Sequence, residues 1–254
     1  MTPLSPLRRA RPDWDGYLAG FHAANPGITE DVLARCTGPH GVTPYEWLVD
    51  GVDPDARTLD VACGSAPTRH LFGDAWTGID RSAAELTRAA RSSAAVARAD
   101  AQHLPVRDGA VDLVVCSMAL MLFDHLDQVL REIRRVLDVG GELRVLVPSR
   151  APLTAADRAT YVRLAAGARR WPRFPDTALG RSAAPFRAAG LAVRRDEACR
   201  FTYPLAREAE CFVRSWYTDG VADGGPAALP RWSVPRRGDL GVGLRCIVAA
   251  CADR

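Results

Sequence analysis

Lysine is absent from this chain. All 33 basic residues among the 254 are arginine, and codon usage in a GC-rich genome explains this better than a function does. The arginines are spread along the chain and leave a net charge of only +3. So small a positive charge does not indicate a nucleic-acid partner.

Metal-binding and membrane-spanning patterns are missing as well. The seven cysteines contain no Cys-x-x-Cys pair and no residues show metal-ligand spacing, so we expect no metal and reduced, buried thiols. The N-terminus has no long apolar stretch. We therefore expect neither a signal peptide nor a membrane partner, and we predict a cytoplasmic protein.

Small residues follow an apolar run in the stretch 58–67, which reads Thr-Leu-Asp-Val-Ala-Cys-Gly-Ser-Ala-Pro. The run Thr58–Val61 is typical of a buried parallel strand. The small side chains after it would let the backbone approach a ligand closely. Pro67 is tolerated in the first turn of a helix, which we predict from there to about Phe72.

A second short strand is predicted at 76–79, with Asp80 at its carboxyl end. Asp80 comes 20 residues after Asp60. At that spacing an acidic side chain can accept hydrogen bonds from both hydroxyls of a ribose. Periodicity and turn residues predict the remaining elements, which are strands at 95–99, 111–117, 142–147, 191–201 and 243–251, and helices at 126–137 (ended by Gly140-Gly141), 182–189 and 206–217.

These segments resemble class I S-adenosylmethionine (SAM) dependent methyltransferases, whose first motif is usually Asp-x-Gly-x-Gly-x-Gly. Gly64 stands at the middle glycine and alanines at the outer two, and the stretch 130–137 followed by Gly140-Gly141 is the most specific match. Alanine at position 66 demands a negative φ or a strained left-handed backbone. The resemblance implies SAM as cofactor, with Asp80 on the ribose and Asp100 on the adenine amine. The cofactor residues it implies are Asp60, Ala62, Cys63, Gly64, Ser65, Asp80, Arg81, Asp100, Ala101 and Ser117.

The same resemblance implies an α/β fold with a Rossmann-like, seven-stranded, doubly wound sheet whose last strand is antiparallel, and a helical cap. We expect residues 1–55 to form the N-terminal helical cap and 56–254 the methyltransferase core, including a lid insertion at 150–178. In the family such additions cover the methyl group. Substrate choice is therefore expected to depend on them.

Aromatic side chains are few, at 7%, but both added segments are rich in them. Each one taken alone is explained better by packing onto the core. Taken together they suggest a small apolar or aromatic substrate. The substrate-binding candidates are Trp14, Tyr17, Phe21, Met121, Trp171 and Phe174.

No catalytic base is evident. Many relatives carry a His-His pair after the fourth strand, where this chain has Met121-Leu122. The candidates for proton transfer are therefore His40 and His22, with Tyr17 next. The tetrapeptide Asn/Asp-Pro-Pro-Tyr/Phe, which marks amino methylation of macromolecules, is replaced by Ser-Met-Ala-Leu at 117–120.

The sequence therefore predicts a methyltransferase of natural-product type that acts on a small, secondary metabolite, as a monomer or homodimer. A second possibility is a SAM-binding protein on the same fold that does not methylate, either a cyclase or decarboxylase or a regulatory binder. The alanine at position 66 and the apolar pair Met121-Leu122 favour this alternative.

Overall fold

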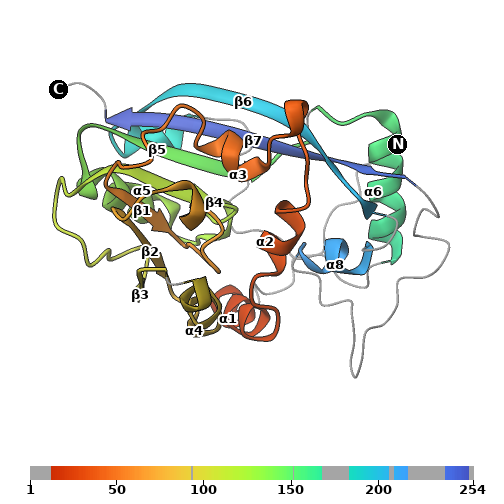
Figure 1. The fold of residues 1–254 in the computed structure, drawn as a ribbon, viewed down its shortest axis with the longest axis horizontal. Helices are drawn as coiled ribbons and strands as arrows, with labels where there is room; N and C mark the ends of the chain where they lie inside the picture. Colours follow the sequence, from red (N-terminus) through yellow and green to blue (C-terminus); the bar gives the residue numbers. More distant parts are fainter. Residues whose placement is uncertain are drawn as a thin grey trace.

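A computed structural model describes residues 13–92, 94–150, 152–167, 183–205, 209–216 and 238–251. Its strands are β1 (Thr58–Val61), β2 (Trp76–Asp80), β3 (Val96–Arg98), β4 (Val111–Ser117), β5 (Leu137–Pro148), β6 (Leu191–Tyr203) and β7 (Leu240–Cys251). They form one sheet in the order β3-β2-β1-β4-β5-β7-β6 (Figure 1). The first five strands run parallel, and β7 is antiparallel to both β5 and β6. The predicted Rossmann-like sheet with an antiparallel last strand is confirmed.

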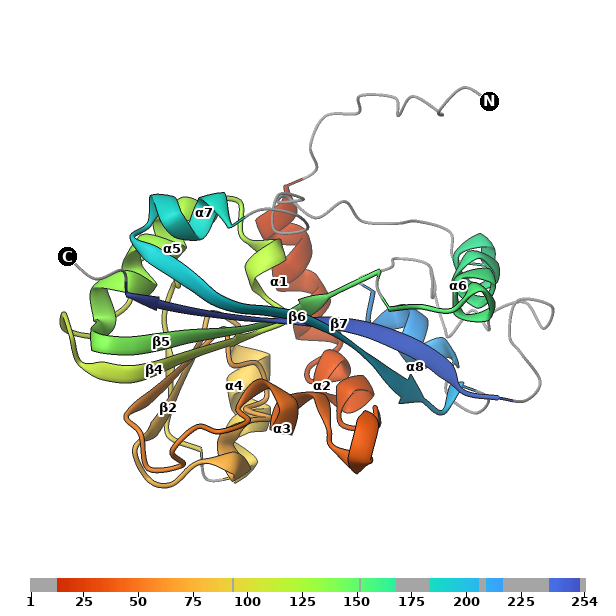
Figure 2. The ribbon, with the colours of Figure 1, turned by 90° about the horizontal axis from the view of Figure 1, so that it is seen from above.

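Helices cover both faces of this sheet. They are α1 (Trp14–Ala24), α2 (Ile28–Leu33), α3 (Pro44–Leu48), α4 (Ala83–Ala89), α5 (Leu126–Val136), α6 (Ala155–Gly167), α7 (Ala184–Ala188) and α8 (Ala209–Arg214). Helices α5 and α7 lie on one face and α3 and α4 on the other, while α6 and α8 lie at the far end of β6 and β7 (Figure 2). Helix α1 packs against α4. The apolar residues of α5 are buried, namely Leu126, Val129, Leu130, Ile133 and Val136.

The helix predicted to start at Pro67 is not formed, and this prediction is wrong. Only a 3-10 turn at Arg69–Leu71 is present. Ala66 adopts a left-handed backbone, with φ of 62°. Two side-chain hydrogen bonds hold the turn at buried Thr68. Its hydroxyl donates to Asp60, and the indole N–H of Trp76 donates to that hydroxyl. The chain therefore turns after β1 without room for a longer helix.

The boundary between α5 and β5 also differs from the prediction. The helix ends at Val136, and the glycine pair expected to end it lies inside β5. Leu137 is buried and already pairs with Val111 of β4. Burial of this side chain in the sheet therefore ends the helix before the glycines are reached.

Candidate cofactor and substrate site

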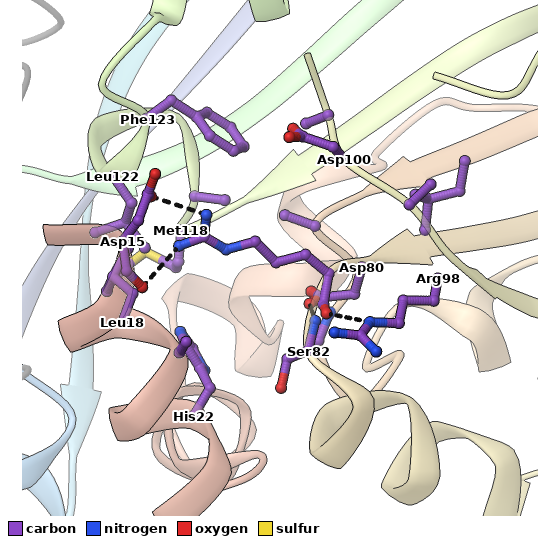
Figure 3. Close-up of a pocket in the computed structure, with 18 of the residues that line it drawn as sticks. Asp15, Leu18, His22, Asp80, Ser82, Arg98, Asp100, Met118, Leu122 and Phe123 are labelled. Carbon is purple, nitrogen blue, oxygen red and sulfur yellow. Dashed lines mark hydrogen bonds and ion pairs between the residues drawn. The ribbon is translucent and has the colours of Figure 1, made fainter. Parts of the chain in front are cut away.

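A cavity of about 450 Å³ lies at the carboxyl ends of the parallel strands β1, β2 and β4. This edge is where open α/β sheets bind their ligands, and the volume suits a small molecule. Figure 3 shows Leu18 and His22, both on α1, on one side of the cavity and Asp80 with Ser82 on the other. An ion pair between Arg81 and Asp15, at 2.8 Å, joins the end of β2 to α1 beside it.

Seven of the ten predicted cofactor residues line this cavity. They are Ala62, Gly64, Asp80, Arg81, Asp100, Ala101 and Ser117. The other three do not line it: Asp60 and Cys63 are buried behind the loop, and Ser65 is half-buried. The structure thus brings together, from four strand ends, residues that lie up to 55 positions apart.

Asp80 is held in place by the backbone. One carboxylate oxygen accepts the N–H of Gly64 at 2.9 Å, and the other accepts the N–H of Ser82 at 2.7 Å. Each carboxylate oxygen can accept more than one hydrogen bond, so the group can still receive hydroxyl donors from the cavity. Asp100, which is exposed, accepts the N–H of Gln102 at 2.9 Å and also faces the cavity (Figure 3).

The loop after β1 has a left-handed backbone at every second residue. The φ angles are 57° at Ala62, 54° at Gly64 and 62° at Ala66. A non-glycine residue in this region is strained by about 1–2 kcal/mol. A Cβ on Gly64 would lie 2.1 Å from Oε1 of Glu30, so an alanine at this position would have to displace the end of that side chain.

The strain predicts the effect of restoring the outer glycines. Ala62→Gly is expected to raise the free energy of unfolding by about 0.5–1 kcal/mol, because relief of the left-handed strain exceeds the added unfolded-chain entropy. Ala66→Gly is expected to be nearly neutral, because it also removes a methyl group that is buried here. Chemical denaturation of both variants measures the difference. A loss of stability at position 62 would contradict the strained conformation.

Asp60 braces the loop rather than facing the cavity. Its side chain is 1% exposed, and its Oδ2 accepts the hydroxyl of Thr68. Its Oδ1 is buried without a hydrogen-bond partner among the described residues. Burial raises the pKa of this carboxyl to about 7.

Of the predicted catalytic candidates, only His22 lines the cavity. Its Nδ1 lies 2.9 Å from Oε1 of Glu85, a side chain that is 2% exposed. Oε2 of Glu85 accepts the N–H of Gly27 at 2.8 Å, so the carboxylate that orients the imidazole is itself fixed. His40 is exposed on the 3-10 turn at 39–41, and Tyr17 is half-buried and stacks on Trp14 and Phe21; neither lines the cavity.

Three of the four substrate candidates that the structure describes pack in the core, and the fourth, Tyr17, is half-buried. Trp14 and Phe21 are buried, and the indole N–H of Trp14 donates to the carbonyl of Leu122 at 2.8 Å. Met121 is buried and does not line the cavity, whereas Met118, with φ of 57°, does. Trp171 and Phe174 lie outside the described residues.

Comparison with known proteins agrees with this geometry. Residues 59–145 match the family described as Methyltransferase domain. This region belongs to the class I SAM-dependent methyltransferases. The match includes the loop after β1, the acid at the end of β2 and the whole of β4.

Two methyltransferases share this region. The chain is 37% identical over 145 residues to malonyl-(acyl-carrier protein) O-methyltransferase of Geobacter sulfurreducens, covering 53% of this chain and 48% of that protein. It is 32% identical over 147 residues to ubiquinone/menaquinone biosynthesis C-methyltransferase UbiE of Ralstonia pickettii, covering 52% and 60%. The chain thus spans about half the length of these relatives. The solved structure of the cyclase SpnF superposes with a TM-score of 0.62 at 19% identity, over 98% of this chain and 100% of that one, which shows the shared fold.

The residues at the cavity fit SAM, the cofactor of that family. The acid at the end of β2 has lone pairs to receive ribose hydroxyls, and Asp100 lies where it could accept the adenine amine. Gly64 has no side chain of its own and lines the cavity, so the amino acid end of SAM could approach its backbone beside the Glu30 carboxylate. Within the part of the chain that the structure describes, no group of acidic, histidine or cysteine side chains could hold a metal ion. No described helix is long and apolar enough to cross a membrane.

Several lining residues of the methyltransferase cavity were not expected from the sequence. On the apolar side these are Leu18, Met118, Leu122 and Phe123. On the polar side they include Glu30 and Arg98. A left-handed Met118 directly after β4 has no sequence pattern that would predict it. The spacing of Trp14, Leu18 and Phe21 at i, i+4 and i+7 is a signal that could have identified this helical face, which is buried.

Proposed function

We propose that this protein transfers the methyl group of SAM to a small apolar metabolite. The observation that carries the proposal is that one cavity holds both carboxylates at the strand ends and a group of apolar side chains. Asp80 and Asp100 line it from the strand side, while Leu18 and Leu122 line it from the opposite side, next to Asp15 (Figure 3). The carboxylates suit the hydroxyl and amine donors of adenosine, and the apolar side chains suit an acceptor with little polarity.

SAM, when bound, supplies an activated methyl group that is transferred by in-line displacement. The protein contributes alignment, since holding two reactants at contact distance removes much of the barrier. An acceptor O–H or N–H must also lose a proton. We propose that His22 accepts it at Nε2, because Nδ1 is oriented toward the carboxylate of Glu85.

An apolar acceptor is favoured over a specifically aromatic one. Among the described residues, Phe123 is the one Phe, Tyr or Trp side chain that lines the cavity, because the aromatic residues of α1 pack inward. The N-terminal helical cap stays part of the proposal, since α1 supplies Leu18 and His22 to the cavity. A macromolecular acceptor is not part of it.

The second candidate is a SAM-binding enzyme that does not methylate. The similarity to the cyclase SpnF extends over 98% of this chain, and the segment after β4 is apolar where many methyltransferases carry histidines. Formation of S-adenosylhomocysteine distinguishes the two candidates, because methyl transfer produces it in a 1:1 ratio with the methylated product.

The deciding experiment incubates the protein with SAM and a panel of small apolar metabolites. S-adenosylhomocysteine and methylated products are then measured by mass spectrometry. Methyl transfer is expected, with Asp80→Ala as the inactive control. Conversion of an acceptor without S-adenosylhomocysteine would instead establish the non-methylating alternative.

A further inference from the structure

Three carboxylates surround Gly64 in the cofactor cavity. Oδ2 of Asp80 accepts its N–H at 2.9 Å, and a Cβ on Gly64 would lie 2.1 Å from Oε1 of Glu30 and 3.9 Å from Oε2 of Glu85. These side chains come from β2, α2 and α4. Glu30 and Asp80 both line the cavity.

Hydrogen bonds of 2.7–2.9 Å hold two of the three carboxylates, while the third, Glu30, lies near the backbone N–H groups of Glu30 and Ser65. Asp80 accepts two backbone N–H groups, and Glu85 accepts the N–H of Gly27 and contacts His22. Glu30 forms no ion pair with a cationic side chain among the described residues. The nearby Arg88 instead forms an ion pair with Asp31. A partly enclosed carboxylate beside two others requires a cation or a proton.

We propose that Glu30 binds the α-ammonium group of SAM. The inference rests on SAM as the cofactor, and Glu30 lies outside the region 59–145 that matches the family. With the ribose at Asp80, the amino acid end of SAM is the part that reaches Gly64, against which the Glu30 carboxylate lies. The sulfonium has to face the acceptor, so it is directed toward the apolar side chains of the cavity.

The electrostatics of Glu30 agree with this role. Burial, together with the negative charges of Glu85 and Asp80, raises its pKa to about 8, while backbone N–H groups of Glu30 and Ser65 oppose the shift. Other charged or titratable groups near Glu30 are Asp31, Arg88 and the buried Tyr45. His22 is also close, because it contacts Glu85. At pH 7 the carboxyl therefore holds a proton, which an ammonium group would displace. Affinity should consequently rise with pH up to about 8.

Three ligands separate the possible roles of Glu30. SAM carries a sulfonium and an ammonium, S-adenosylhomocysteine carries only the ammonium, and 5′-methylthioadenosine carries neither. Glu30→Gln is expected to weaken binding of the first two by about tenfold to a hundredfold, the effect of one charge-assisted hydrogen bond. Binding of 5′-methylthioadenosine should stay within about twofold. Asp31→Asn is the matched control, because this neighbour pairs with Arg88 and does not line the cavity.

Isothermal titration calorimetry measures these affinities. Carried out at pH 7 in buffers of different ionisation enthalpy, it also counts the protons released. The wild-type protein should release nearly one proton per S-adenosylhomocysteine bound, and Glu30→Gln nearly none, because the α-amino group of the ligand is already mostly protonated.

Several results would overturn the proposal. One is that Glu30→Gln weakens the binding of all three ligands equally, of SAM alone, or of none of them. Another is that the wild-type protein and Glu30→Gln release equal numbers of protons. Binding of 5′-methylthioadenosine also shows that the variant is folded at its site. If the wild-type protein binds none of the three ligands, the cofactor assignment itself fails, and the role of Glu30 with it.

Discussion

His22→Asn is expected to lower kcat by about 10²- to 10⁴-fold for an acceptor that must lose a proton, the contribution of a positioned general base. His22 lines the cavity, and its Nδ1 contacts a carboxylate that is 2% exposed, so the ring is held in one orientation. Asparagine keeps a polar side chain but cannot accept the proton. Steady-state kinetics with an acceptor found in the methyl-transfer assay measures the change.

The affinity for SAM should stay within about threefold in this variant, because only the proton acceptor is removed. His40→Asn is the comparison, since His40 is exposed and does not line the cavity, and its turnover should match that of the wild type. Glu85→Gln tests whether Glu85 orients the imidazole of His22. This variant should lower kcat less than His22→Asn does, and it should change the dependence of turnover on pH. Unchanged turnover in His22→Asn with a flat profile from pH 6 to 9 would contradict the role of the imidazole. It would indicate a carbon nucleophile or an acceptor that is already ionised.

The sheet edge that holds the cofactor could be predicted from the sequence. Strands β1 and β4 were predicted with the bounds that the structure has, because buried parallel strands are continuous apolar runs ended by turn residues. In a parallel sheet the residues that follow such runs meet at one edge. The resemblance to the family assigned Asp80, Asp100 and Ser117 to one site, and the cavity contains all three.

The apolar part of the cavity could not be predicted in the same way. It depends on how α1 crosses the strand ends, and this is fixed by long-range contacts such as that of the Trp14 indole with the Leu122 carbonyl, 108 residues away. Trp14 and Phe21, which were substrate candidates, are consequently core residues. Glu30 and Glu85 were not predicted for the same reason. Acidic residues on short helices have no sequence pattern that shows which of them come together in the fold.

Backbone conformation was the other source of error. At Ala66 the sequence left open a negative φ or a strained left-handed backbone, and a helix was predicted from Pro67 onward. The structure shows the left-handed conformation at Ala62 and Ala66 as well as at the glycine between them. Local propensity fails here because the loop is shaped by its neighbours in space.

Asp80→Ala is expected to lower the affinity for SAM at least tenfold. Each hydrogen bond from a ribose hydroxyl to the carboxylate contributes about 1.5–3 kcal/mol, and alanine removes the acceptor for both. The variant also leaves the N–H groups of Gly64 and Ser82 without their partner, so the loop after β1 loses a brace beside the cofactor. Asp80→Asn keeps one acceptor oxygen and should weaken binding less. Calorimetric titration with SAM and with S-adenosylhomocysteine measures the series.

Asp74→Ala is the matched control, because this acid precedes the same strand and its side chain is fully exposed. Its affinity for SAM should equal that of the wild type. Thermal unfolding of each variant separates loss of the site from loss of the fold. Unchanged affinity in a folded Asp80→Ala protein would mean that the ribose binds elsewhere. Among the residues that the structure describes, no other acid at the cavity lies at the end of β2 and accepts a hydrogen bond from the loop after β1.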